Sequence, residues 1–270
     1  KKCYKVAQGL NSPCKFCTNS KLKKGEVYCW EHFNEMLGRT FQLQDNLIDY
    51  NGHRARVEVV FDVSDHIVKE RELQTVLDTQ RELTSIVQVI NGMGTIDERL
   101  NAVLKKGGEY FQADRAYIFL INKQGKLDNA YEWCKSEVEP QIGNLQGIEI
   151  RFIDRWMPYF KENKAIVTSD IENIRESMPD EYEILKKQNI RSIVEAPLYN
   201  GNQLIGFFGL DNPAPKKAES IGELLISLAY AIANAYIREE NEQKLQKIFK
   251  NTIQSLFSAN PESLCTFRVN

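Results

Sequence analysis

The feature that most constrains the fold of this chain is a hairpin pattern that occurs three times. Within residues 41–63, two alternating runs of apolar and polar residues flank Asn51 and Gly52, which both tolerate the positive φ of a tight turn. Two strand-like runs around a polar turn occur again within 116–134 and 192–211. Helical segments separate these hairpins: one begins with a capping box at Thr95 and Glu98, and another is expected over residues 152–161. The sequence therefore predicts an α+β fold in which helices pack against antiparallel sheets.

Two long helical patterns are expected, over residues 65–92 and 218–257. In the first, apolar residues recur at steps of three and four, with Gln80 as the polar interruption, which is typical of a heptad seam. The second carries an apolar stripe as far as Arg238 and becomes charged beyond it. We expect a homodimer that pairs through both helices, with two-fold symmetry.

Composition excludes several classes of partner. The 35 basic and 37 acidic residues nearly cancel, giving a net charge of −2, so no nucleic-acid partner is expected. The most apolar run, residues 224–237, is shorter than the roughly 20 residues needed to span a bilayer, so no membrane segment is expected either. No secretory signal opens the chain and its cysteines are scattered, which favours the cytoplasm.

The region from residue 95 to about 238 resembles a GAF domain over essentially its full length. The motifs that carry the resemblance lie, in order, at 113–119, 131–134, 191–199 and 204–213. The resemblance implies an antiparallel sheet flanked by helices and, when a small ligand is bound, a site between one sheet face and the helices and loops that follow the second strand.

The N-terminal region resembles the C-terminal part of a PAS domain of the cysteine-bearing type. The matching motifs lie at 2–6, 13–17, 28–32 and 61–64. Together, the two resemblances imply the sensory half of a bacterial signalling protein, such as a diguanylate cyclase, a cyclic-dinucleotide phosphodiesterase or a sensor kinase. No motif of those output domains occurs in the sequence, so we expect a non-catalytic segment of a longer protein.

We expect the following organisation along the chain. A partial PAS domain covers 1–64, a linker helix covers 65–93, the GAF domain covers 94–238, and an output helix covers 239–257. The start of a further domain, with a strand at 264–269, covers 258–270.

The strand at 192–198 indicates where a ligand would bind. One of its faces carries small and aliphatic residues suited to helix packing, whereas the other carries Glu195, whose carboxylate is costly to bury against an apolar stripe. We therefore place Glu195 on the pocket face. The expected ligand-binding residues are Phe119, Tyr131, Trp133, Phe152, Trp156, Ile193 and Glu195. The alternative is that the aromatic residues simply fill the core.

The first 32 residues contain four of the six cysteines and one of the three histidines. Cys3, Cys14, Cys17 and His32 would complete a zinc site of three thiolates and one imidazole, with Cys29 as an alternative fourth ligand. A redox-sensing disulfide and reduced structural thiols are the other two interpretations. Cys134 is a weaker candidate, as an anchor for a bilin or a nitrosyl group.

The functional hypothesis is a regulatory segment that binds a small ligand or senses redox state. It would transmit the signal through dimeric helices to an output domain that is absent from this chain. The competing hypothesis is a scaffold in which degenerate PAS and GAF folds bind a protein partner and sense nothing.

Overall fold

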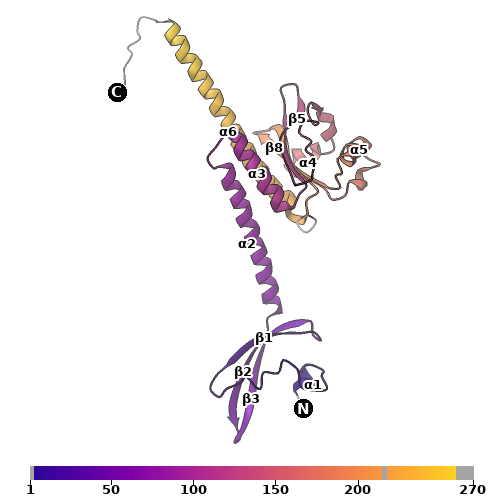
Figure 1. The fold of residues 1–270 in the computed structure, drawn as a ribbon, viewed down its shortest axis with the longest axis vertical. Helices are drawn as coiled ribbons and strands as arrows, with labels where there is room; N and C mark the ends of the chain where they lie inside the picture. The colour runs from indigo at the N-terminus through magenta and orange to yellow at the C-terminus, as the bar shows by residue number, and fades with distance from the viewer. Residues whose placement is uncertain (1–2, 215–217, 260–270) are drawn as a thin grey trace, which may run out of the picture. The chain divides into compact units, whose positions relative to one another are not determined.

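The structure is a computed structural model that describes residues 3–214 and 218–259. The chain divides into two compact units between Thr79 and Gln80, and each unit is described by itself below (Figure 1). The predicted strand at 264–269 lies outside the described residues. No helix in the described part of the chain combines the length and the apolar character needed to cross a membrane.

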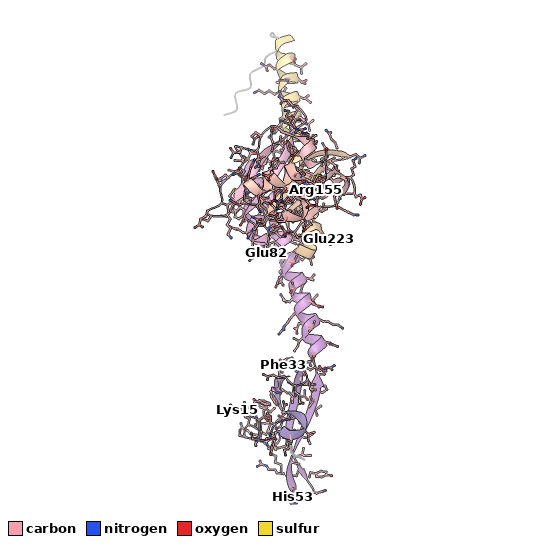
Figure 2. All side chains as sticks on the ribbon, turned by 90° about the vertical axis from the view of Figure 1, so that its right-hand side faces the viewer. Lys15, Phe33, His53, Glu82, Arg155 and Glu223 are labelled. Carbon is pink, nitrogen blue, oxygen red and sulfur yellow. The ribbon has the colours of Figure 1, made fainter. Side chains whose placement is uncertain are left out.

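The N-terminal unit is built on a three-stranded antiparallel sheet in the order β1-β2-β3. Its elements are α1 (Cys3–Ala7), β1 (Tyr28–Asn34), β2 (Arg39–Tyr50) and β3 (His53–Asp62). The hairpin predicted around Asn51 and Gly52 is confirmed: both residues have positive φ, 52° and 76°, as a tight turn between twisted strands requires. Figure 2 shows His53 at the end of the sheet where this turn lies.

A buried carboxylate holds the loop before β1 against this sheet. Asp45 is fully buried and accepts hydrogen bonds from Thr18 Oγ1 at 2.7 Å, Trp30 Nε1 at 2.9 Å and Arg56 Nε at 2.9 Å. Burying a carboxylate is tolerated when charged and polar partners satisfy it in this way. Asp45 therefore fixes the segment that carries the cysteines.

Helix α2 (Ser64–Ile90) matches the predicted linker helix closely. This helix ends at Ile90, and α3 (Ile96–Phe111) begins with the predicted capping box. Thr95 Oγ1 accepts from the backbone N–H of Glu98, and the Glu98 carboxylate accepts from the backbone N–H of Thr95. Such a capping box satisfies two backbone donors that the helix itself leaves free.

The C-terminal unit contains a six-stranded sheet in the order β6-β5-β4-β9-β8-β7, with antiparallel neighbours throughout. The strands are β4 (Arg115–Ile121), β5 (Lys126–Cys134), β6 (Ile148–Glu149), β7 (Ile166–Thr168), β8 (Ile193–Asn200) and β9 (Gln203–Asp211). Helix α3 and the long helix α6 (Ala218–Ala259) pack on one face of this sheet and form the larger of two cores.

The second core lies on the opposite face, beneath the helices η1 (Ile150–Ile153), α4 (Met157–Lys161), η2 (Ile171–Ile174) and α5 (Pro179–Lys187). The prediction of one helix over 152–161 is wrong, because η1 ends at Ile153 and α4 begins only at Met157. Pro158 explains the break: it lacks an N–H and clashes with the carbonyl one turn earlier, so it is tolerated only in a first turn.

Candidate ligand-binding site

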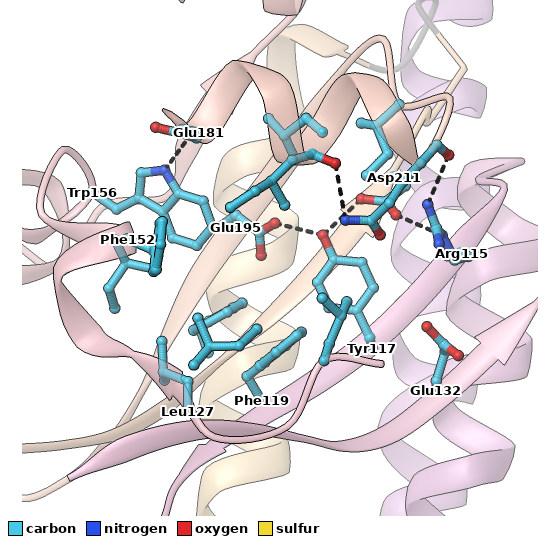
Figure 3. A pocket seen from close by; sticks show the side chains of 18 residues that line it. Arg115, Tyr117, Phe119, Leu127, Glu132, Phe152, Trp156, Glu181, Glu195 and Asp211 are labelled. Atoms are coloured by element: carbon cyan, nitrogen blue, oxygen red, sulfur yellow. Dashed lines mark hydrogen bonds and ion pairs between the residues drawn. The ribbon is translucent and has the colours of Figure 1, made fainter. Parts of the chain in front are cut away.

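A cavity of about 100 Å³ lies between the sheet of the C-terminal unit and the elements that cover its second face (Figure 3). Its lining residues come from β4, β5, β8 and β9, from the segment around η1, and from α5 and its C-terminal loop. They are Arg115, Tyr117, Phe119, Leu127, Glu132, Leu145, Ile148, Phe152, Ile153, Trp156, Glu181, Ile184, Leu185, Gln188, Ile190, Glu195, Phe207 and Asp211.

Strand alternation separates this cavity from the helix-facing core. On β8, Val194, Ala196 and Leu198 belong to the core formed with α6, whereas Glu195 lines the cavity, as the sequence predicts. On β4, Tyr117 and Phe119 face the same side as Glu195. Each strand therefore contributes side chains to both faces of the sheet.

Aromatic rings form the apolar part of the wall. The rings of Phe119 and Phe207 stack with centroids 4.8 Å apart and planes at 10°. The indole of Trp156 meets Phe207 edge-on, with centroids 5.2 Å apart. Offset stacked and edge-on contacts are the favoured aromatic geometries, so these three rings hold one another in place around the cavity.

Two carboxyl groups share one tyrosine hydroxyl at the polar end. The Tyr117 hydroxyl oxygen lies 2.6 Å from Glu195 Oε1 and 2.7 Å from Asp211 Oδ1. Arg115 Nε lies 2.8 Å from Asp211 Oδ2 in a buried ion pair. A hydroxyl has a single hydrogen. Tyr117 can therefore donate to only one carboxyl, and the other must be protonated and donate to the tyrosine oxygen.

The charges nearby decide which carboxyl holds the proton. Burial raises the pKa of Glu195 well above its usual range, opposed in part by its hydrogen bond with Tyr117. Burial also raises the pKa of Asp211, but Arg115 opposes the shift and the value is about 6. At neutral pH, the protonated carboxyl of Glu195 therefore donates to the Tyr117 oxygen, and the Tyr117 hydroxyl donates to Asp211. Asp211 is ionised and pairs with Arg115.

The second carboxyl oxygen of Glu195 has no hydrogen-bond partner among the described residues, although it is fully buried. In Figure 3 it points away from Tyr117, toward the side on which Phe119 and Leu127 lie. The backbone leaves room for it at Gly209, where an added Cβ would lie 2.1 Å from this oxygen. Buried acceptors normally have partners. On the cavity lining, this oxygen and Arg115 Nε are the buried side-chain atoms without a hydrogen bond among the described residues, and Arg115 Nε is ion-paired with Asp211, so Glu195 Oε2 is the acceptor that lacks any partner.

Other carboxylates on the cavity wall are satisfied by the protein. Arg155 donates to both oxygens of Glu181, at 2.9 and 2.6 Å, and Trp156 Nε1 donates to Glu181 Oε1 at 3.0 Å. Glu132 accepts from the backbone N–H groups of Gln141 and Ile142, at 2.8 and 2.9 Å. These bonds fix the indole of Trp156 and the loop after β5.

The structure brings together four of the seven residues predicted for ligand binding: Phe119, Phe152, Trp156 and Glu195 line the cavity. Ile193 is fully buried in the core on the same face without being among the lining residues. The sequence analysis missed several polar and aromatic members. These are Arg115, Tyr117, Glu132, Phe207 and Asp211.

The placement of Tyr131 and Trp133 on the cavity face is wrong. Tyr131 donates to Asp97 Oδ1 at 2.6 Å, and Trp133 lies against Gly108, both on α3. The cause is a β-bulge in β5: Tyr131 pairs with Ile118 and Asn129 pairs with Phe119, so Ala130 has no partner. An extra residue moves every later side chain to the other face. The two aromatics do share a face, but it faces the helices.

The predicted zinc site is not supported. The His32 ring packs against Phe16, with centroids 4.1 Å apart and planes tilted by 34°. Cys3, Cys14 and Cys17 line a small depression. Burial is the main cause that raises the pKa of the Cys14 thiol, and the neighbouring Cys17 is the second. Within residues 3–214 and 218–259, no group of three or more His, Cys, Asp or Glu side chains is placed to hold a metal ion.

The C-terminal unit is an α+β domain whose antiparallel sheet packs helices on one face and holds a small cavity on the other. Residues 95–236 match the GAF domain family, and the chain belongs to that family. The sequence is also 32% identical over 165 residues to the methanogenesis regulatory histidine kinase FilI of Methanothrix harundinacea. That match covers 56% of this chain and 17% of the kinase.

Solved structures with the same fold include photoreceptor domains. The phycoerythrobilin-bound GAF domain of a cyanobacterial phytochrome is 14% identical, with a TM-score of 0.51 over 62% of this chain and 99% of that one. The chromophore-binding domain of a bacteriophytochrome from R. palustris is 10% identical, with a TM-score of 0.51 over 80% and 75% of the two chains. At this identity the likeness concerns the fold.

Proposed function

We propose that this chain is a non-catalytic sensory segment that binds a small ligand in the GAF cavity and passes the signal to an output domain through its long helices. The observation that carries the proposal is the unpaired, buried oxygen of Glu195 on the wall of a largely apolar cavity. Leaving such an acceptor unsatisfied costs free energy, and a ligand that donates to it recovers that cost.

The sheet offers a direct route from the cavity to α6. Glu195 faces the cavity, and its neighbours Val194 and Ala196 belong to the core formed with α6. A ligand changes the helix arrangement only if it binds one arrangement more tightly than another. Because β8 contacts both the ligand cavity and α6, a shift of this strand would make the ligand affinity differ between two helix arrangements.

The same proposal includes a homodimer that forms through α2 and α6. Beyond the sheet, α6 carries Leu245, Phe249 and Leu256 at heptad spacing, with the polar Thr252 at the remaining position of the stripe, and Phe249 is 68% exposed. On α2, Leu73 and Val76 are each 60% exposed. Exposed apolar stripes of this kind are typical of helices that pair with a second copy. Light scattering tests this: a monomer well above micromolar concentration contradicts it.

For the N-terminal unit, we infer a partial PAS domain over 1–64. Its three-stranded antiparallel sheet supports this inference, as do the motifs at 2–6, 13–17 and 28–32. Because the match to FilI spans only part of that protein, a kinase output is a proposal here. It is the output that this relative favours over a cyclase or a phosphodiesterase.

The bilin of the photoreceptor neighbours does not fit this chain. The cavity of about 100 Å³ is far smaller than the several hundred Å³ of a typical ligand site, and a tetrapyrrole is larger still. Cys134 is outside the lining, and burial together with Glu132 raises the pKa of its thiol to about 11. A neutral thiol is a poor nucleophile for covalent attachment.

The small volume of the cavity also favours the second candidate function, a protein-binding scaffold without a ligand. A thermal-shift screen of the whole chain separates the two, using a panel of purines, amino acids, amines, single-ring heterocycles and nucleotides. Stabilisation by a panel compound that rises with its concentration supports sensing, because a ligand of the folded state raises its stability. No shift with any compound supports the scaffold.

A further inference from the structure

The volume of the cavity limits the size of its ligand. A buried apolar cavity of about 150 Å³ holds one benzene molecule, and this cavity measures about 100 Å³. The space inside the cavity therefore accommodates one ring or a similarly short chain, of roughly six non-hydrogen atoms. Nucleotides and tetrapyrroles exceed this limit several-fold.

The charge of the wall excludes anions. The lining contains four carboxyl groups and a single guanidinium: Glu132, Glu181, Glu195, Asp211 and Arg115. The guanidinium is already used, because Arg115 pairs with Asp211 and donates to the backbone carbonyl of Gln188. A ligand carboxylate or phosphate would face these carboxyl groups, including the unpaired Oε2 of Glu195, in a region of low dielectric, where like charges repel strongly.

The unpaired acceptor determines the polar group of the ligand. Glu195 is 1% exposed, and its Oε1 is held by Tyr117, so the free Oε2 is fixed against Gly209. The rings of Phe119 and Phe207 line the same cavity. Those rings stack on each other and leave a flat apolar wall. A planar ligand with one N–H group satisfies both features, since its ring packs on the wall while the N–H donates to the carboxyl oxygen.

We propose that this cavity selects a single-ring compound bearing an N–H donor, neutral or singly cationic, whose N–H bonds to Glu195 Oε2. Azoles and small cyclic amines are members of this class. The inference rests on the proposed sensory function and specifies which ligands the site accepts. The Glu195 carboxyl group accepts the hydrogen bond through Oε2, and it is protonated when the ligand is neutral.

Isothermal titration calorimetry of the whole chain with pyrazole and isoxazole tests the donor. These rings have the same size and shape, but isoxazole has an oxygen where pyrazole has its N–H. Because a lost hydrogen bond to a buried acceptor changes affinity by roughly tenfold or more, we expect pyrazole to bind at least that much more tightly. Equal affinities for the two rings, or tighter binding of a ring carrying a carboxylate, would overturn the proposal.

Two substitutions test the acceptor. Glu195→Gln reproduces the protonated carboxyl, since its amide N–H₂ can donate to Tyr117 while its oxygen takes the position of Oε2; we expect pyrazole binding within about threefold of wild type. Glu195→Leu keeps the volume but removes the acceptor, and we expect the preference for pyrazole over isoxazole to disappear. Circular dichroism confirms folding, and Glu162→Gln, at an exposed pair with Lys164, is the surface control.

Failure of this inference differs from failure of the proposed function. If larger or anionic compounds stabilise the chain and N–H rings do not, the sensory function stands and the ligand class is wrong. If no compound of the panel binds, the sensory function itself is wrong. If pyrazole binds equally to wild type and Glu195→Leu, the ring occupies another site, and the assignment to Glu195 is overturned.

Discussion

Glu195 and Ala196 are consecutive residues of β8 that face opposite sides of the sheet: the carboxyl group lines the cavity, and the methyl group packs in the core with α6. One peptide unit therefore separates the candidate ligand site from the candidate output helix. A bound ligand that displaces this strand would shift the packing of α6, because close-packed cores transmit small shifts.

The shared hydroxyl of Tyr117 predicts a loss of stability in Tyr117→Phe. The substitution keeps the ring but leaves Glu195 and Asp211 without their common partner. We expect the free energy of unfolding to fall by about 1–3 kcal/mol, the cost of unsatisfied buried groups. Urea denaturation measures it, with Tyr159→Phe at a 48% exposed position as the control. Equal effects of the two substitutions would show that the shared hydroxyl contributes nothing specific.

Gly209 predicts a steric effect at the same place. An added Cβ would lie 2.1 Å from Glu195 Oε2 and 2.3 Å from Tyr117 Cε2, whereas one at Gly143 meets nothing within 4 Å. We expect Gly209→Ala to lower the free energy of unfolding by about 1–3 kcal/mol through overpacking and to weaken ligand binding. Gly143→Ala is the matched control. If Gly209→Ala is as stable as this control, the close packing described here is incorrect.

The buried carboxyls predict that stability declines as the pH rises. The folded state raises the pKa of Glu195 well above its usual range and that of Asp211 to about 6. It therefore retains protons that the unfolded chain releases above about pH 4. Stability from Asp211 is lost between about pH 4 and pH 6, and that from Glu195 at higher pH, by at most roughly 1.4 kcal/mol per pH unit for each group.

Denaturation of wild type and Glu195→Gln at several pH values checks this sign. The amide does not titrate, so we expect the variant to become progressively more stable relative to wild type as the pH rises. The contribution of Asp211 remains in both proteins. A difference that stays constant with pH, or that changes in the opposite direction, would contradict protonation of Glu195 in the folded state.

The exposed stripe on α6 predicts that charge disrupts self-association. Leu245 and Phe249 lie four residues apart on the helix and are 66% and 68% exposed. We expect Phe249→Glu to convert the dimer to a monomer in size-exclusion chromatography with light scattering, because two buried like charges would face each other across the seam. Lys247→Glu, outside this stripe, is the charge control. A dimer that survives Phe249→Glu would place the interface elsewhere.

The local parts of the fold could be predicted from sequence. The turn at Asn51 and Gly52 and the capping box of Thr95 and Glu98 involve neighbours in the chain, and their signals need no tertiary information. The break before Pro158 was also readable, because proline belongs in a first helical turn, but the apolar spacing across 152–161 obscured it.

The site depended on information that is not local. The bulge at Ala130 arises from pairing with β4, and it reverses the faces of Tyr131 and Trp133 without any signal in their own strand. Arg115 on β4 forms an ion pair with Asp211 on β9. These strands are far apart in the sequence, so neither residue alone indicates a site. The face on which Glu195 lies could be predicted, because burying a carboxylate of an apolar strand against an apolar core costs free energy whichever element packs there.

The central claim is that a small ligand binds in the cavity at Glu195. Its most direct test is isothermal titration calorimetry of wild type and Glu195→Leu with the compound that most stabilises the wild-type chain in the thermal-shift screen. We predict measurable one-site binding to wild type and a loss of at least roughly tenfold in affinity for the variant. Unchanged affinity in a folded variant, or no binding to wild type, would contradict the account.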